Sequence, residues 1–356
     1  MRCVSSLLSP DVLRAAGTRI FGAVGAPDEI AARVAHSLVD ANLAGHDSHG
    51  VIRIPSYVRA VRAGEVVPNA NPELLRETEV SAVVDGGWAF GQLTAERATR
   101  VAMDKARQHG IAVVAAVRCT HIGRLGEYAE MGAAEGMIVF LAAGGLTGKR
   151  GQVAPHGGGR GVLGTNPLAF GFPGGSEEFP VLLADFATSA VAAGKIMVAR
   201  AKGVPLPPGS IQDAEGRPST RADDYASGGS LLPFGGHKGY GLMVVVELLG
   251  RVLTGSSAYA EDGRGGDVYG QSGTLVLAMD PGLFRDRDEY ARDADATLRR
   301  IKAIPPAPGV DEVLLPGEPE RRSRMEREHS GIPVEDATLE AIRDVAQSVG
   351  LGQDVV

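Results

Sequence analysis

Helix-like and strand-like segments alternate through the middle of this chain. Residues 91–110 carry apolar side chains at helical spacing and end on a glycine, and residues 111–119 are continuously apolar, like a buried strand. The same succession of helix and strand follows at residues 126–137 and 138–145. This alternation predicts a mixed α/β fold.

Further apolar segments continue the pattern toward the C-terminus. Residues 181–190 and 274–281 have the composition of buried strands, and residues 237–255 form a long apolar helix pattern. A charged helix is expected near residues 285–304, and a last helix from about Pro333.

The N-terminal part is expected to be helical. Residues 9–45 indicate two amphipathic helices, with Ser9 as an N-cap, Pro10 at the first helical position and Gly45 as the end. A shorter helix is predicted at residues 55–64. The first and last helices of the chain could pack together.

Composition excludes several classes of partner. The net charge is −7 with no basic stripe and 5 % aromatic residues, so we expect no nucleic acid. Two cysteines, Cys3 and Cys119, cannot make a disulfide framework, which favours a reducing cytoplasm. The longest apolar stretch, GMIVFLAAGGL, is too short to span a bilayer, so no membrane is expected.

Two familiar nucleotide-binding signatures fail on context. GRGVLG at residues 159–164 matches G-x-G-x-x-G, but no strand leads into it and Pro167 disfavours an immediate helix. GGLTGKR at residues 144–150 resembles a P-loop, yet Ala143 and Arg150 stand where a glycine and a hydroxyl residue belong. Neither a Rossmann fingerprint nor a P-loop is predicted.

The stretch GHDSHGVIRIP, residues 45–55, concentrates reactive side chains on a loop after a helix. His46, Asp47 and His49 could be metal ligands, although their spacing is weak evidence. Alternatively, Asp47 and Ser48 could bond the local backbone in a purely structural loop. A third interpretation is acid–base chemistry on an organic acid, because a histidine can exchange a proton and Arg53 can hold a carboxylate.

His121 is a second candidate. It follows the apolar run 111–119, where the loops of α/β folds often carry chemistry. A buried structural histidine is the alternative.

Several motifs together resemble the malate/L-lactate dehydrogenase family, most closely its hydroxycarboxylate dehydrogenase branch. They occur in family order between about Leu13 and Ile342, and they are GHDSHGVIRIPSYVRA, HIGRLGEYAE, GTNPLAF, LLADFATSAVAAGK, KGVPLPPG, HKGYGL and PGE followed by GIPV. The resemblance implies an L-sulfolactate dehydrogenase-like α/β fold with a mostly antiparallel cofactor-binding sheet and a helical subdomain formed by both termini. It therefore explains why the Rossmann test fails.

The resemblance also implies an activity. Members are NAD(P)-dependent oxidoreductases that interconvert 2-hydroxy acids and 2-oxo acids, and they are typically homodimers. We expect NAD, with NADP possible, because Arg150 or Arg160 could hold a 2′-phosphate. The L (S) stereochemistry is expected by analogy.

By the same resemblance, particular residues take particular roles. His49 with Ser48 serves proton transfer, Arg53 binds the substrate carboxylate, His121 lies in the site and Asp185 helps orient the histidine. The implied cofactor-binding residues are Thr165, Asn166, Asp185, Ala187, Thr188, Ser189, His237, Lys238, Gly317 and Glu318. Lys238 fits this role physically, since a cation at a helix start suits a pyrophosphate.

No linker or repeat marks a domain boundary. We expect residues 1–78 plus 285–356 to form the helical subdomain with the catalytic loop, and residues 79–284 the cofactor-binding α/β domain. The alternatives are an imino-acid reductase or ureidoglycolate dehydrogenase of the same family, a nucleotide-binding relative without activity, or a metal-dependent hydrolase or lyase. The last would use His46, Asp47, His49 and His121 as ligands.

Overall fold

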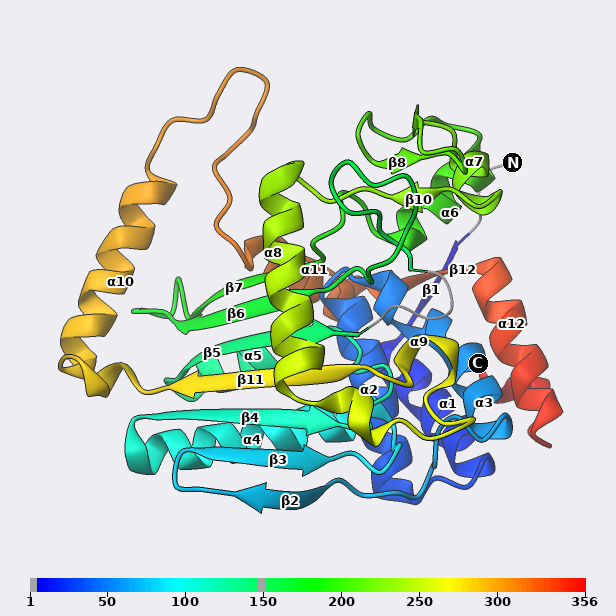
Figure 1. Cartoon of the computed structure of the whole chain (residues 1–356), viewed down its shortest axis with the longest axis horizontal. Coiled ribbons are helices and arrows are strands. Elements are labelled where there is room, and N and C mark those ends of the chain that lie inside the picture. The colour runs from blue at the N-terminus through cyan, green and yellow to red at the C-terminus, as the bar shows by residue number, and fades with distance from the viewer. Residues whose placement is uncertain (1–4, 146–150) are drawn as a thin grey trace.

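A seven-stranded sheet forms the centre of the computed structural model, which describes residues 5–145 and 151–356 (Figure 1). Its strands lie in the order β2 (Glu73–Glu77), β3 (Ser81–Asp85), β4 (Ile111–Val117), β11 (Gly273–Met279), β5 (Ile138–Gly144), β6 (Leu168–Pro173) and β7 (Val181–Phe186). β3 and β4 run parallel, and each other neighbouring pair runs antiparallel. The predicted fold class, mostly antiparallel and not of the Rossmann type, is confirmed.

Helices cover both faces of this sheet. α4 (Gly91–His109) and α5 (Gly126–Ala134) pack on one face, while α8 (His237–Glu247) and the π-helical turn Leu248–Leu253 cross the other (Figure 1). The central strands are therefore buried on both sides, which explains their continuous apolar composition. Val114, Leu141 and Val276 of the three middle strands are fully buried.

The N-terminal helices form as the sequence predicts. α1 (Pro10–Ala23) and α2 (Asp28–Leu43) pack side by side, and the Ser9 side chain accepts a hydrogen bond from the Asp11 amide at 3.2 Å as the N-cap of α1. α3 (Ile54–Arg62) follows after two 3₁₀ turns, Asp47–His49 and Val51–Arg53. The candidate loop is thus a short, ordered connection between α2 and α3.

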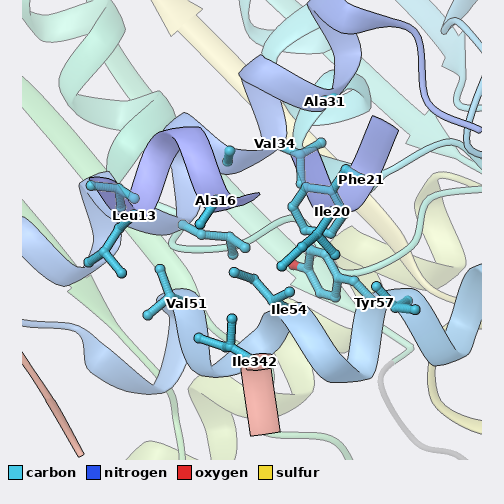
Figure 2. Close-up of a cluster of buried hydrophobic side chains, with 14 of the residues drawn as sticks. Leu13, Ala16, Ile20, Phe21, Ala31, Val34, Val51, Ile54, Tyr57 and Ile342 are labelled. Atoms are coloured by element: carbon cyan, nitrogen blue, oxygen red, sulfur yellow. The ribbon is translucent and has the colours of Figure 1, made fainter. Parts of the chain in front are cut away.

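The two ends of the chain meet in this helical core. β1 (Ser5–Leu8) pairs antiparallel with β12 (Ile332–Glu335), and α12 (Asp336–Ser348) places Ile342 against Val51 and Ile54 (Figure 2). The expectation that the first and last helices share a core is confirmed.

A smaller layer lies beside the main sheet. It consists of the strands β8 (Ile211–Gln212), β9 (Pro218–Ser219) and β10 (Ser230–Leu231), with the helices α6 (Ala193–Lys202) and α7 (Ala222–Ala226). Its core gathers Val153, Ile196, Ile211, Leu231 and Met243. This layer brings α6 toward the loop that carries His49.

Three local predictions need correction. The last helix begins at Asp336 rather than near Pro333, because residues 332–335 pair with β1. α11 (Glu318–Ser330) was not anticipated, since its sequence EPERRSRMEREHS has no apolar stripe. The α8 pattern ends at Glu247, and the chain continues as a π-helical turn with Gly250 against the Gly144 backbone.

α10 (Arg287–Lys302) stands at one edge of the molecule (Figure 1). Its Leu298 packs with Phe179 and Leu315 rather than with the helical core of the N-terminus. The division into residues 1–78 plus 285–356 and 79–284 stays a prediction.

Among residues 5–145 and 151–356, no helix combines the length and the apolar character that a membrane crossing requires.

Candidate active site

One cavity of about 1120 Å³ gathers most of the predicted site residues. It lies where the ends of β4, β7 and β11 meet the loop between α2 and α3. The predicted residues that line it are Ser48, His49, Arg53, His121, Thr165, Asp185, Ala187 and Ser189. Segments up to 140 positions apart in the sequence therefore converge on one volume.

The loop carrying His49 is held by the end of α2. The Asn42 Nδ2 donates to Asp47 Oδ1 at 2.6 Å, and Asn42 Oδ1 accepts from the Val51 amide at 2.8 Å. A Cβ on Gly50 would lie 2.2 Å from Asn42 Oδ1, so the loop passes too close for any side chain there. Arg327 of α11 donates to the Asp47 carboxylate from the outside.

His49 is fixed by its neighbour and enclosed by the opposite wall. Its Nδ1 lies 3.1 Å from Ser48 Oγ, which leaves Nε2 as the free ring nitrogen. α6 approaches so closely that a Cβ on Gly194 would lie 3.2 Å from Ser48 Cβ. Burial, followed by the nearby Arg53 charge, lowers the pKa of His49 to about 3, so the ring is neutral at pH 7.

A hydrogen-bonded chain fixes His121. Gln92 Nε2 on α4 donates to the Tyr57 hydroxyl at 2.8 Å, and that hydroxyl lies 2.6 Å from His121 Nδ1. Since the hydroxyl accepts from Gln92, its own proton points to His121 Nδ1, and the neutral ring carries its hydrogen on Nε2. Burial, then the Arg53 charge, lowers the pKa of His121 well below its usual value.

The two imidazole rings lie one over the other. The His49 and His121 ring centroids are 5.6 Å apart with an interplanar angle of 15°. One ring therefore offers a basic nitrogen and the other an N–H donor within the same small volume.

Arg53 is half-committed. Its Nε donates to the Ser48 carbonyl at 2.7 Å, which ties the guanidinium to the catalytic loop. Within residues 5–145 and 151–356, no acidic side chain forms an ion pair with Arg53. Its terminal nitrogens are thus available for an anion in the cavity.

Asp185 lies at the end of β7, and its contacts differ from the expected ones. Its Oδ2 accepts from the Gly126 amide at the start of α5 at 2.7 Å, and in the described parts of the chain neither His49 nor His121 hydrogen-bonds to it. Burial raises the pKa of this carboxyl, opposed by the Gly126 amide and the Arg124 charge. An orienting role toward His49 stays a prediction.

The GTNP segment and the residues after β7 support one another. The Thr188 hydroxyl donates to the carbonyls of Thr165 at 3.0 Å and Asn166 at 2.9 Å, and Ser189 Oγ donates to the Val191 carbonyl at 3.0 Å. Asn166 is fully buried, and its Nδ2 bonds the Met243 carbonyl and Glu247. Thr165 and Ser189 line the cavity, whereas Asn166 and Thr188 lie behind it.

His237 and Lys238 are exposed at the start of α8 and lie outside the cavity lining. Their segment still borders the site, because the Phe234 amide donates to the Thr188 carbonyl at 3.0 Å and the Phe234 ring contacts Phe186. A cofactor-binding role for His237 and Lys238 stays a prediction.

Gly317 and Glu318 lie beside a smaller cavity of about 120 Å³. Glu318 is buried, and its Oε2 accepts from Lys302 Nζ at 2.7 Å and from the Leu315 amide at 2.7 Å. Gly317, with φ 92°, packs against Leu183, two residues before Asp185. These contacts show a structural use of Glu318, and cofactor binding by the pair stays a prediction.

The side chains of the alternative metal site are directed elsewhere. His46 Nε2 lies 3.2 Å from Glu320, and Asp47 is bonded by Asn42 and Arg327. In the described ranges, no three His, Cys, Asp or Glu residues are grouped so that they could hold a metal ion.

Arg150 lies outside the described residues. Arg160 is exposed and is not part of the cavity lining.

Several site residues were not singled out from the sequence. Tyr57 lies one helical turn after Arg53, so its position on α3 was a usable signal. Gln92 and Tyr269 come from α4 and from α9 (Gly266–Tyr269), and their approach to His121 depends on tertiary packing alone. Lys195, in the first turn of α6, also lines the cavity.

Comparison with known proteins gives a consistent result. A family model described as malate/L-lactate dehydrogenase matches residues 8–343. Hydroxycarboxylate dehydrogenase B of Escherichia coli O157:H7 is 38 % identical over 343 residues, covering 95 % of this chain and 92 % of that protein. L-sulfolactate dehydrogenase of Methanocaldococcus jannaschii is 34 % identical over 328 residues, covering 92 % of each chain.

Solved structures agree with the sequence matches. The sulfolactate dehydrogenase structure from Methanocaldococcus jannaschii superposes with a TM-score of 0.87 at 31 % identity, covering 98 % of this chain and 99 % of that one. The Δ1-piperideine-2-carboxylate reductase structure from Pseudomonas syringae gives a TM-score of 0.81 at 30 % identity, covering 96 % and 100 %.

Proposed function

The chain belongs to the malate/L-lactate dehydrogenase family, and we propose that it is an NAD(P)-dependent dehydrogenase of small 2-hydroxy acids. The observation that carries this proposal is the set of three side chains in one cavity. His49 offers a basic nitrogen, His121 an N–H donor and Arg53 an unpaired cationic face. A 2-oxo acid presents the matching groups, a carbonyl oxygen beside a carboxylate.

Arg53 binds the carboxylate in this proposal. Its terminal nitrogens form a planar pair of donors that matches the two carboxylate oxygens, and the Nε bond to the Ser48 carbonyl fixes their position. The substrate is therefore held by its acid end, with the carbonyl carbon next to the histidines.

His121 orients the carbonyl oxygen. Tyr57 holds Nδ1, so the Nε2–H is the group that can donate to the substrate oxygen. A neutral imidazole in this role stabilises developing negative charge without giving up its proton.

His49 moves the proton at its Nε2. In the free protein this nitrogen is unprotonated, so it can accept the hydroxyl proton when a 2-hydroxy acid is oxidised. For reduction, the ring must first be protonated. A bound carboxylate favours this step because it offsets the Arg53 charge that contributes to the low pKa of His49.

The cavity fits a nicotinamide dinucleotide together with a substrate. Its volume of about 1120 Å³ is at the upper end of ordinary ligand sites, and it contains the half-exposed ring of Phe186. α6 has no side-chain cap, so its first amides and Lys195 suit a phosphate. Thr165, Ala187 and Ser189 would complete the binding surface, and the bound cofactor would supply the hydride to the carbonyl carbon.

We propose NAD as the preferred cofactor, the L (S) hydroxy acid as the product, a homodimer as the assembly and the cytoplasm as the location. These follow from family membership and from the composition of the chain.

The test is oxidation of NADH and NADPH in parallel with pyruvate, hydroxypyruvate, oxaloacetate, phenylpyruvate and Δ1-piperideine-2-carboxylate. We expect turnover of at least one 2-oxo acid, unaffected by a chelator. Turnover of the cyclic imine alone would favour the imino-acid reductase alternative, which the fold shared with the Pseudomonas syringae reductase supports. Silence across the panel with folded protein would contradict the proposal.

A further inference from the structure

Tyr269 occupies a position in the cavity that no role described above explains. α9 carries it to the start of β11, where its ring contacts His121 with centroids 5.7 Å apart at an angle of 64°. Its side chain lines the cavity together with Arg53 and His121. The ring is therefore part of the wall around the predicted substrate carboxylate.

The segment before Tyr269 is shaped to deliver this ring. Gly265 and Gly266 have φ values of 67° and 58°, and their missing side chains would meet the Trp88 ring at 2.6 Å and the Glu65 carboxylate at 2.7 Å. The Gly265 amide donates to the Glu65 carbonyl at 2.9 Å, and Arg264 donates to the Gly64 carbonyl at 2.6 Å. These contacts join α9 to the turn that follows α3.

The other end of the turn is fixed as well. Ser272 Oγ donates to the Tyr269 carbonyl at 3.0 Å and to the Cys119 carbonyl at 2.8 Å. The backbone of Tyr269 is thus tied to the residue two positions before His121. A ring held in this way keeps its position without help from its own hydroxyl.

The Tyr269 hydroxyl has no hydrogen-bond partner in residues 5–145 and 151–356, although the other polar groups around it are bonded. The Tyr57 hydroxyl bonds Gln92 and His121, and Arg53 Nε bonds the Ser48 carbonyl. Burial raises the pKa of Tyr269 while the Arg53 charge opposes this shift. The hydroxyl is therefore a neutral donor within electrostatic range of the Arg53 guanidinium.

We propose that the Tyr269 hydroxyl donates a hydrogen bond to the substrate carboxylate that Arg53 holds. This inference rests on the proposed function. A carboxylate accepts at about four positions, and Arg53 can fill two of them, so a buried carboxylate requires a further donor. Tyr269 is a cavity-lining donor without another use, and it makes the site selective for substrates with an acid group next to the carbonyl.

The competing role is packing, in which the Tyr269 ring only keeps His121 in position. The two roles predict different kinetics. Loss of a carboxylate donor weakens the ground state and the transition state alike, which raises KM and leaves kcat nearly unchanged. Loss of His121 positioning lowers kcat.

The experiment uses Tyr269→Phe, which removes the hydroxyl and keeps the ring on His121, with Tyr225→Phe outside the cavity as the control. The first readout is the KM and kcat of the 2-oxo acid. The second is the Kd of oxamate, an unreactive carboxylate of similar shape, measured by calorimetry with NADH present. Thermal unfolding checks that each variant is folded.

We expect Tyr269→Phe to raise KM and the oxamate Kd together by about ten- to hundredfold, as for a lost hydrogen bond to a charged group. The kcat value should stay within about threefold, and Tyr225→Phe should match the wild type. Unchanged KM and Kd, or a fall in kcat at constant KM, would overturn the inference and leave the proposed function intact. A wild-type protein silent with every 2-oxo acid would overturn both.

Discussion

The Tyr57 hydroxyl lies 2.6 Å from His121 Nδ1 while it accepts a hydrogen bond from Gln92 at 2.8 Å. This arrangement assigns the proton of the hydroxyl to the His121 bond, so the imidazole presents Nε2–H to the cavity. A helix from the N-terminal core and a helix from the sheet layer thus jointly set the tautomer of one ring.

Removing this hydroxyl should impair His121 rather than substrate affinity. In Tyr57→Phe, Nδ1 of His121 loses its donor and Gln92 Nε2 loses its acceptor. We expect kcat to fall by about ten- to a hundredfold, with a smaller change in KM, because a wrong tautomer no longer donates to the substrate oxygen. Steady-state kinetics checks this, and an unchanged kcat would show that Tyr57 does not set the tautomer.

The low pKa of His49 predicts how the two reaction directions depend on pH. Because burial and the Arg53 charge hold this pKa at about 3, the free enzyme already has a neutral base at pH 5. The kcat/KM of hydroxy acid oxidation should therefore be nearly flat from pH 5 to 8, and that of 2-oxo acid reduction should fall about tenfold per unit. A profile with the pH dependence in the oxidation direction would contradict this assignment.

The same shifts predict a loss of stability in acid. The pKa of His49 and that of His121 lie below the unfolded value of about 6.5, so between these values the unfolded chain binds more protons. The free energy of unfolding should then decrease as pH falls below about 6.5. Each histidine contributes up to about 1.4 kcal/mol per pH unit.

Urea unfolding of the wild type and of His121→Asn between pH 7 and 4.5 tests this, since asparagine does not titrate. The variant should lose stability less steeply than the wild type. Parallel curves would show that His121 is not held neutral in the folded protein, because carboxylates such as Asp40 contribute equally to both.

The contact between Gly50 and Asn42 should be needed for the shape of the catalytic loop. A Cβ at Gly50 would lie 2.2 Å from Asn42 Oδ1, so Gly50→Ala should cost about 1–3 kcal/mol of stability and lower kcat. In a double-mutant cycle, Gly50→Ala with Asn42→Ala should be less destabilised than the sum of the single variants.

Gly22→Ala on α1 is the matched control, since its added Cβ would meet nothing within 4 Å. This variant should be neutral or slightly more stable, because alanine favours a helix more than glycine does. Strictly additive effects of the Gly50 and Asn42 substitutions would contradict the predicted clash.

The sequence predicted much of the fold because the decisive signals are local. The Ser9 cap, the apolar periodicity of α1, α2 and α4, and the apolar runs of β4, β5 and β11 can all be recognised without knowing the partners. α11 was missed because ion pairs and a glycine turn, rather than an apolar stripe, define it.

The candidate site was predictable where one short motif holds it. Ser48, His49 and Arg53 are consecutive on one loop, and their convergence with His121 followed from motifs and resemblance. Gln92 and Tyr269 carried no such signal, because a glutamine in a helix and a tyrosine before a strand are common. Their importance arises only from packing between α4, α9 and the end of β4.

The central claim is that this cavity transfers a hydride to the carbon next to a carboxylate held by Arg53. Mass spectrometry of the product formed from NADH deuterated at nicotinamide C4 tests it most directly, with Arg53→Lys as the comparison and Arg59→Lys as the control. The account predicts one deuterium on C2 of the hydroxy acid, and a KM raised strongly, about a hundredfold, in Arg53→Lys alone. A product without deuterium on C2, or equal KM values in both variants, would contradict it.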